Sequence, residues 1–402
     1  MQVIVQKFGG TSVADLERIR NVAKLVQKEL KQGNKVIAIV SAMAGVTNSL
    51  IMQCQQLSRL DNIDSLREYD TAIASGETIT SALLALELQT IGIKSKSLQG
   101  WQIPIKTSKA HGNAQVIDLD SSLLKNFLNN GITPVITGFQ GVADDFNITT
   151  LGKGGSDTTA AVIAASINAH RCDIYTDVDG IYTADPRVVH NAKKIDVIDI
   201  NQLYELCTSG AKVLHPRAAL AAKRYGFNLR VLSSFDINST GTTAINIIKN
   251  MENTSITAIT SNKNLLKITA EHNAEILAQI IQAFAHNEVI IEQASSHLSK
   301  QSVLIVNLVD KNKCEKLLDD LKSKQLITKY SIDSNISSVT VVGYGIKNDS
   351  NLIYELIDLL KSHGISVFSA DLSDLKFSIV VDDHDNEKTI KLLHDKCFPE
   401  TS

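Results

Sequence analysis

Short apolar segments alternate with amphipathic ones over residues 1–250 of the chain. Residues 2–8 have the pattern of a buried strand, and apolar positions from Leu16 to Leu30 recur at helical spacing. We expect residues 12–15 to form a capping box that opens this helix. Further strand patterns lie at 35–41, 132–137, 172–177 and 228–233, and helical patterns near 48–60, 78–91, 121–130, 157–168 and 212–225. This alternation predicts an α/β domain with an open, mostly parallel sheet and helices on both faces.

A repeat of about 75 residues occupies the rest of the chain. Each copy reads strand, helix, strand, strand, helix. The first copy has its patterns at 265–269, 273–286, 289–295, 303–309 and 312–323, and the second at 339–342, 350–362, 365–370, 377–381 and 386–395. The first copy ends in a further strand at 326–332, whereas an additional strand at 256–260 precedes it. We hypothesise that this preceding strand completes the sheet of the second copy, so that two α+β units are interleaved.

These patterns predict three parts of the chain. The α/β domain would span residues 1–248, a first α+β unit residues 262–333, and a second unit residues 253–261 plus 334–402. Glycine usage agrees, because only three of the 21 glycines follow residue 250. A site built from bare backbone amides is therefore expected in the first part. Met251, at the junction, is either an internal start for a separate shorter chain or, more simply, an incidental linker residue.

Charge and composition exclude several classes of protein. The 40 basic and 43 acidic side chains leave a net charge of −3, so no basic stripe for nucleic acid and no polybasic membrane anchor is expected. No apolar run approaches the ~20 residues of a membrane span. The chain enters a strand pattern at once, without the basic start of a secretion signal, which favours the cytoplasm. Five scattered cysteines without zinc spacing predict no protein-bound metal.

Five segments rich in glycine, hydroxyl groups or charge follow predicted strands or open predicted helices. They are residues 7–12, 41–47, 74–77, 149–159 and 176–187. Ligands of open α/β sheets bind at the edge where strands end and helices begin. Glycine amides, helix N-termini and lysine side chains there would attract an anion, most strongly at 149–159. Taken singly, the first segment could equally be a glycine turn, the second a plain helix cap and the last a hairpin.

Familiar catalytic motifs are missing from the sequence. It contains no P-loop, no dinucleotide fingerprint, no GxSxG or HExxH motif and no protein-kinase signature. The ten histidines form no motif with a serine or cysteine nucleophile. His111 and His215 are the best placed of them, and we expect both to be structural.

Taken together, the segments resemble the aspartate kinase family. The motifs that carry the likeness are KFGGTS at 7–12, VSAM at 40–43, ASGE at 74–77, GFQG at 138–141, TTLGKGGSDTTA at 149–160, TDVDGIYTADPR at 176–187 and GAKVLHPRA at 210–218. The family combines an amino-acid kinase fold with C-terminal, ferredoxin-like ACT regulatory units, which the repeat resembles in pattern. The resemblance implies that ATP, with Mg²⁺, phosphorylates the β-carboxylate of L-aspartate to give 4-phospho-L-aspartate, the first step towards lysine, threonine and methionine.

The chemistry of that reaction suits these residue types. The accepting carboxylate, with a pKa of about 3.9, is ionised at neutral pH and needs no general base. The protein must align two anions and neutralise charge on the transferring phosphoryl group. Lysines, glycine amides and helix N-termini can do both.

The resemblance also implies roles for individual residues. Lys7, Asp157 and Lys212 would be catalytic. The nucleotide would contact Lys7, Gly9, Gly10, Thr176, Asp177, Tyr182, Arg187 and Lys212. Aspartate would contact Ser41, Thr47, Glu77, Lys153, Gly154, Gly155 and Ser156. Glu77 would meet the substrate ammonium group, and Lys153 its α-carboxylate.

Three questions stay open at this point. The substrate of the same fold could be glutamate or N-acetylglutamate, or the chain could be an idle amino-acid sensor. The ACT units imply feedback by lysine or threonine, but neither unit has the Asp-x-Pro-Gly turn that often binds such an effector. The alternative is that the units only associate chains, which predicts a homodimer or higher oligomer.

Lys153 stands where the glycine loop of aspartate kinases normally carries an arginine. A guanidinium grips a carboxylate with two parallel hydrogen bonds, whereas an ammonium group is a point charge. Lys153→Arg should therefore lower the KM for aspartate in steady-state assays of ADP release. A higher KM would show that the site is already built around lysine.

Overall fold

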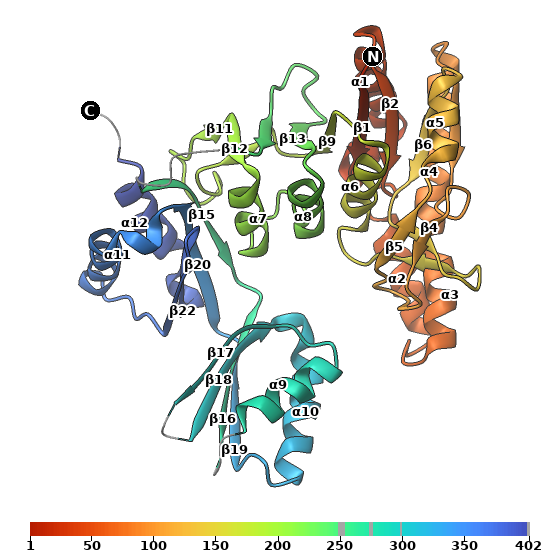
Figure 1. Ribbon diagram of the computed structural model, residues 1–402. Coiled ribbons are helices and arrows are strands. Elements are labelled where there is room, and N and C mark those ends of the chain that lie inside the picture. The colour runs from red at the N-terminus through yellow and green to blue at the C-terminus, as the bar shows by residue number, and fades with distance from the viewer. Residues whose placement is uncertain (248–253, 273–275, 298–299, 400–402) are drawn as a thin grey trace. The chain divides into compact units, whose positions relative to one another are not determined.

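A computed structural model describes residues 1–247, 254–272, 276–297 and 300–399 (Figure 1). The chain forms two compact units. The first consists of Met1–Tyr182, Lys193–Thr208 and the described part of Lys212–Lys249. The second consists of Thr183–Ala192, Ser209–Ala211 and the described part of Asn250–Ser402. Met251 lies outside the described residues, so the idea of an internal start there stays untouched by the structure.

An eight-stranded sheet forms the centre of the first unit. Its strands, in spatial order, are β12 (Val197–Asp199), β14 (Thr242–Ile245), β13 (Asn228–Ser233), β9 (Arg171–Thr176), β1 (Val3–Phe8), β2 (Lys35–Val40), β6 (Thr133–Thr137) and β3 (Ser95–Leu98). All neighbouring pairs are parallel except β13 and β14. Residues Val36–Val40 of β2 are all fully buried, as both faces of the sheet are covered. The predicted α/β class is confirmed.

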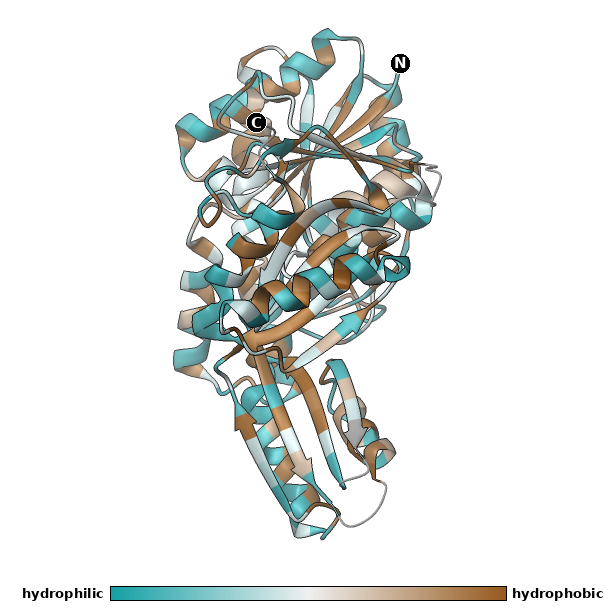
Figure 2. Ribbon diagram, turned by 90° about the vertical axis from the view of Figure 1, so that its left-hand side faces the viewer, coloured by the Kyte–Doolittle hydropathy of each residue, from teal (hydrophilic) through white to brown (hydrophobic). Residues whose placement is uncertain are grey.

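Eight helices accompany this sheet in the described part of the first unit. They are α1 (Leu16–Lys31), α2 (Val46–Leu57), α3 (Ile63–Ile73), α4 (Ser75–Thr90), α5 (Ser122–Asn129), α6 (Gly155–Ile167), α7 (Ile200–Thr208) and α8 (Pro216–Tyr225). Alternate residues of β2, among them Val36, Ala38 and Val40, pack in one core with α1 and α4. Helix α6 packs against β1, β2 and β9, and against α8. Figure 2 shows the matching pattern, with largely hydrophobic strands and helices that mix hydrophilic and hydrophobic residues.

Two predicted helix starts are wrong. Residues 10–13 form a separate 3-10 turn, and α1 begins at Leu16, where the Asp15 side chain accepts a hydrogen bond from the Arg18 N–H at 2.8 Å. Ser12 is 1% exposed and does not cap the helix. The helix predicted at 212–225 begins only at Pro216, because proline suits the first helical position and His215 accepts the cap hydrogen bond. Lys212 therefore precedes the helix.

A smaller sheet, absent from the sequence prediction, lies beside the main one. It contains β5 (Val116–Leu119), β4 (Ile105–Thr107), β7 (Gln140–Val142) and β8 (Ile148–Thr150), in that spatial order. A two-stranded hairpin, β10 (Ile181–Tyr182) with β11 (Lys194–Ile195), completes the strands of the first unit. Because β8 ends at Thr150, this small sheet determines where the glycine-rich loop begins.

Two four-stranded sheets form most of the second unit. The first has the order β17 (Ile291–His297), β18 (Gln301–Asn307), β16 (Leu265–Glu271), β19 (Lys329–Asp333), with α9 (Leu277–His286) and α10 (Lys311–Ser323). The other has the order β15 (Ser255–Asn262), β20 (Ile336–Tyr344), β22 (Lys376–Asp382), β21 (Ser369–Leu372), with α11 (Ser350–Ser362) and α12 (Asn386–Cys397). Residues 273–275 of the predicted helix 273–286 lie outside the described residues.

Strand β15 pairs antiparallel with β20, from Ser255 opposite Tyr344 to Asn262 opposite Ser338. The strand that precedes the first repeat therefore lies in the sheet of the second repeat, as the interleaving hypothesis requires. The domain bounds 1–248, 262–333 and 253–261 plus 334–402 stay a prediction. Among the described residues, no helix combines the length and the apolarity needed to cross a bilayer.

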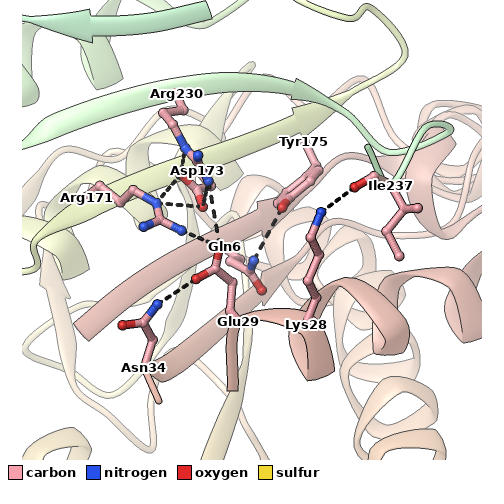
Figure 3. A network of polar contacts seen from close by, with 9 residues as sticks. All are labelled: Gln6, Lys28, Glu29, Asn34, Arg171, Asp173, Tyr175, Arg230 and Ile237. Carbon is pink, nitrogen blue, oxygen red and sulfur yellow. Dashed lines mark hydrogen bonds and ion pairs between the residues drawn. The ribbon is translucent and has the colours of Figure 1, made fainter. Parts of the chain in front are cut away.

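A buried network of charges joins α1 to β9 and β13 (Figure 3). Asp173 on β9 is fully buried and accepts hydrogen bonds from Arg171 Nε at 3.0 Å and from Arg230 Nε at 2.8 Å. Glu29 on α1 pairs with Arg171 and accepts a hydrogen bond from Asn34 at 2.8 Å. Two carboxylates thus neutralise two guanidinium groups where apolar side chains would otherwise pack.

Removal of Asp173 should destabilise the first unit strongly. Asp173→Ala leaves two arginines partly buried beside a single carboxylate, and breaking a buried pair in this way costs about 3–5 kcal/mol. The free energy of unfolding from urea titration measures the loss. Asp118→Ala is the control, because its ion pair with Lys106, at 3.8 Å, is solvent-exposed and contributes about 0–1 kcal/mol. Equal, small effects of the two substitutions would contradict a stabilising role for the network.

Candidate active site

A pocket of about 360 Å³ lies at the carboxyl edge of the main sheet. Strand β1 contributes its end, and the loop after β2 together with the start of α2 forms a second wall. The remaining lining comes from the first turns of α4 and α6, the loop before α6 and Phe139 after β6. The residues that line it are Lys7, Gly10, Ser41, Ala42, Met43, Ala44, Gly45, Thr47, Asn48, Glu77, Phe139, Gly152, Lys153, Gly154, Gly155, Ser156 and Asp157. Four of the five segments singled out in the sequence therefore meet around one pocket.

An ion pair between Lys7 and Asp157 lies in this pocket. Lys7 Nζ is 2.7 Å from Asp157 Oδ1, and each side chain is 12% exposed. Lys7 comes from β1 and Asp157 from the first turn of α6. Asp157 Oδ2 also accepts a hydrogen bond from the His215 N–H at 3.1 Å, which holds the carboxylate from a second side. The ammonium group is thus fixed in a site of low solvent exposure, where charge interacts strongly.

The first turn of α6 lines the same pocket. Gly154, the residue before the helix, has a left-handed backbone with φ +71°, and a Cβ there would lie 2.2 Å from the His215 ring. Only glycine tolerates both conditions. No described side chain caps this helix. The Gly155 N–H donates to the Gly152 carbonyl at 2.9 Å, which leaves the N–H groups of Ser156 and Asp157 to bind an anion.

Glu77 lies in the first turn of α4 and is 3% exposed. Its Oε1 accepts a hydrogen bond from the Ala42 N–H at 3.0 Å. Burial raises the pKa of Glu77 to about 7, and the Ala42 N–H partly opposes that rise. A buried carboxyl group in a pocket whose pKa is raised to about 7 is typical of functional sites.

The loop after β2 is tied to α6 by hydroxyl groups. Ser41 Oγ donates to Ser156 Oγ at 3.0 Å. Gly10 lies against this loop, since a Cβ there would come within 2.9 Å of the Ala42 carbonyl oxygen. Gly9 donates its N–H to the Tyr175 carbonyl at 3.2 Å. The two glycines therefore let the start of the first loop approach both neighbouring strands.

Several residues predicted for the nucleotide do not line this pocket. Thr176 donates to Asp177 at 3.0 Å at the end of β9, and Tyr182 donates to Asp179 at 2.9 Å. Lys212 lies in the turn before α8. Arg187 belongs to the second unit, where its guanidinium pairs with Asp185 at 2.7 Å. Their nucleotide role stays a prediction.

Lys153 lines the pocket as an exposed side chain of the glycine loop. Arg217 forms a hydrogen bond beside this loop: it donates to the Leu151 carbonyl at 2.9 Å, and it also donates to Asn113 Oδ1 at 3.0 Å. Its guanidinium braces the loop from outside the pocket. Arg217 therefore does not take the place of the arginine that aspartate kinases normally carry at the position of Lys153.

Sequence reasoning missed two polar or aromatic residues of the pocket, Asn48 and Phe139. Phe139 has a left-handed backbone, with φ +70°, which is strained for a bulky residue. Its position in the GFQG motif was the available signal. Asn48 directly follows Thr47, and nothing in the sequence around it indicated a place in the pocket.

Comparisons with known proteins agree with this geometry. Residues 2–233 match the model of the amino acid kinase family. The aspartokinase of Rickettsia felis is 45% identical over 391 residues, which cover 97% of this chain and 98% of the relative. The structure also matches Escherichia coli aspartokinase III in complex with aspartate and ADP, with a TM-score of 0.85, 25% identity and coverage of 99% of this chain and 100% of the other. The same enzyme in complex with lysine and aspartate matches with a TM-score of 0.75 and 26% identity, covering 99% of this chain and 100% of that one. The chain belongs to the amino acid kinase family and, within it, to the aspartokinases, the kinases that phosphorylate aspartate.

Proposed function

We propose that the pocket around Lys7 transfers the γ-phosphoryl group of ATP to the β-carboxylate of L-aspartate. One observation carries the proposal: the Lys7–Asp157 ion pair lies at the uncapped N-terminus of α6, beside the two glycine-rich loops. Related aspartokinases and the aspartate and ADP bound to the Escherichia coli enzyme support the choice of reactants.

The aspartate side of the pocket contains groups for each charge of the substrate. Glu77 would meet the ammonium group, and Lys153 the α-carboxylate. Ser41, Thr47 and Ser156 supply hydroxyl groups, and Gly154 and Gly155 bring backbone close to the ligand. Because Glu77 and Lys153 both line the pocket, their opposite charges would orient aspartate with its β-carboxylate towards Lys7.

The nucleotide side includes Lys7 and Gly10 of the pocket and other residues that do not line it. Lys7 and the amides of Gly9 and Gly10 would hold the β- and γ-phosphates, and Lys212 would offset charge at the leaving group. Thr176, Asp177, Tyr182 and Arg187 would frame adenine and ribose, as the resemblance to aspartate kinases implies. Mg²⁺ commonly binds one or two carboxylates together with substrate phosphates. We propose that it accompanies the nucleotide, whose phosphates supply its main ligands, and that it neutralises their charge.

The chain's own residues need not remove a proton. Aspartate reacts as a carboxylate, so Lys7 and the α6 amides act by placing the two anions in line and by stabilising charge on the transferring group. Asp157 keeps the Lys7 ammonium group in position through the 2.7 Å contact. Fixed donors of this kind act without reorganisation at the moment of reaction.

Regulation would reside in the second unit. The Escherichia coli enzyme has been crystallised with lysine, and the two four-stranded sheets of this chain have the arrangement expected of ACT units. We propose that lysine or threonine binds there, and that exposed sheet edges associate two chains into a homodimer or a higher oligomer.

The decisive experiment measures ADP release by the purified protein with ATP and Mg²⁺. L-aspartate should support release, whereas glutamate and N-acetylglutamate should not. Addition of lysine and of threonine, separately and together, tests the regulatory part. Release with glutamate or N-acetylglutamate alone would reassign the substrate, and release with none of the three would contradict the proposal.

Lys7→Ala should reduce kcat by about 10²–10³-fold, because it removes a positioned positive charge from the phosphoryl-transfer site. Steady-state assays at saturating aspartate and ATP measure the change, and circular dichroism should show an unchanged fold. Lys24→Ala, at an exposed position of α1, is the matched control and should leave kcat unaltered. Near-normal turnover of the Lys7 variant would remove this residue from the mechanism.

The KM for aspartate should fall as the pH rises through about 7, because Glu77 has a raised pKa of about 7 and attracts the substrate ammonium group only when ionised. Glu77→Gln should remove this pH dependence and raise the KM at pH 8. Measurements of KM between pH 6 and 8.5 test the expectation, with the exposed Glu17→Gln as control. A wild-type KM that is flat over this range would exclude titration of Glu77 from aspartate binding.

A further inference from the structure

Asp70 is a fully buried carboxylate outside the pocket, in the last turn of α3. It accepts hydrogen bonds from the Gly112 N–H at 3.0 Å, from His111 Nδ1 at 2.8 Å and from the Thr150 N–H at 3.1 Å. The Thr150 hydroxyl also donates to it. Among the described residues, the ion pairs of Asp70 include no lysine or arginine. Its carboxylate is satisfied by donors from the loop that contains His111 and Gly112 and from the end of β8.

The position of Asp70 links two walls of the pocket. Its carbonyl accepts from the Ala74 N–H at 3.1 Å, directly before α4 and Glu77. Its carboxylate holds Thr150, which lies at the end of β8, just before the glycine loop that carries Lys153. The Asp70 side chain therefore joins α3, which runs directly into α4 and Glu77, to the segment that presents Lys153.

The neighbouring contacts make this link rigid. The Thr150 carbonyl accepts from the Ala114 N–H at 2.8 Å, and Gln140 Nε2 donates to the Ala74 carbonyl at 2.6 Å. A buried carboxylate that loses its donors would leave several polar groups unsatisfied. The geometry of this junction is thus strongly determined.

We propose that Asp70 is a positioning residue that sets the separation between Glu77 and the Lys153 loop, and thereby the affinity for L-aspartate. The inference rests on the proposed function, because it assumes that these two segments hold opposite charges of one substrate. Asp70 itself does not line the pocket. A displacement of either segment would lengthen the contacts of Glu77 or Lys153 with the substrate, and hydrogen bonds weaken steeply with poor geometry.

The hydrogen-bond chemistry provides a matched set of variants. Asp70→Asn keeps the shape, and the Thr150 hydroxyl can rotate to accept from the new amide group. Thr150→Val removes that hydroxyl at equal volume. In the double variant Asp70→Asn with Thr150→Val, the new amide N–H faces a methyl group and is left without this acceptor. Asp64→Asn, exposed in the first turn of the same helix, is the control.

The experiment determines kcat and the KM values for aspartate and ATP, together with the melting temperature, for each full-length variant. Asp70→Asn should change each kinetic constant less than threefold, Thr150→Val should raise the KM for aspartate severalfold, and the double variant should raise it at least tenfold. The KM for ATP and kcat should stay within threefold throughout. If the double variant fails to fold, Thr150→Val alone decides the outcome.

Two results would overturn the inference. An unchanged KM for aspartate in both Thr150→Val and the double variant would show that the junction does not set affinity. A parallel loss of kcat, of both KM values and of melting temperature would show a merely structural role. A wild-type protein that does not phosphorylate aspartate would overturn the proposed function, and this inference with it, whereas the first two results leave the proposed function intact.

Discussion

The short contact between the Lys7 ammonium group and the Asp157 carboxylate is the interaction around which the active-site pocket is organised. It joins the central strand β1 to the N-terminus of α6. The Lys7 ammonium group, the positive end of the α6 dipole and the two glycine loops therefore lie in the same pocket. The pair is only slightly exposed, and each partner prevents the other from being an isolated buried charge. An arriving phosphate would find positive charge already in place, with little rearrangement required.

Much of the fold could be predicted from periodicity, and the failures have physical causes. Strand β2 is buried on both faces, so its continuous apolar run from Val36 to Val40 is unambiguous. Helix α3 was missed because it exposes Ile63 and buries Asp70, which inverts the usual pattern. Ser12 resembled a cap but is buried within the 3-10 turn 10–13, and Asp15 caps α1 instead. The strands of the small sheet are only three or four residues long, too short for a period-two signal.

The candidate active site could be predicted from the sequence about as completely as the fold. Segments that combine glycine with charge, such as the one containing Lys153, converge because carboxyl ends of parallel strands share an edge. Phe139 and Asn48 carry no charge, and their place in the pocket depends on how loops from different strands meet. The partners of Asp70 come from segments some 40 and 80 positions away along the chain, and no local pattern reveals such a junction. Long-range polar contacts are therefore the part of the site that sequence reasoning sees least.

The pairing of β15 with β20 has a consequence for how the protein is made. Synthesis proceeds from the N-terminus, so the ribosome produces residues 255–262 well before it reaches residues 336–344. During that interval the earlier strand has no native neighbour along its hydrogen-bonding edge, and unpaired strand edges invite association with other chains. The nascent polypeptide must therefore wait for residues 336–382 before this sheet can close, and contacts with neighbouring chains would matter most in that interval.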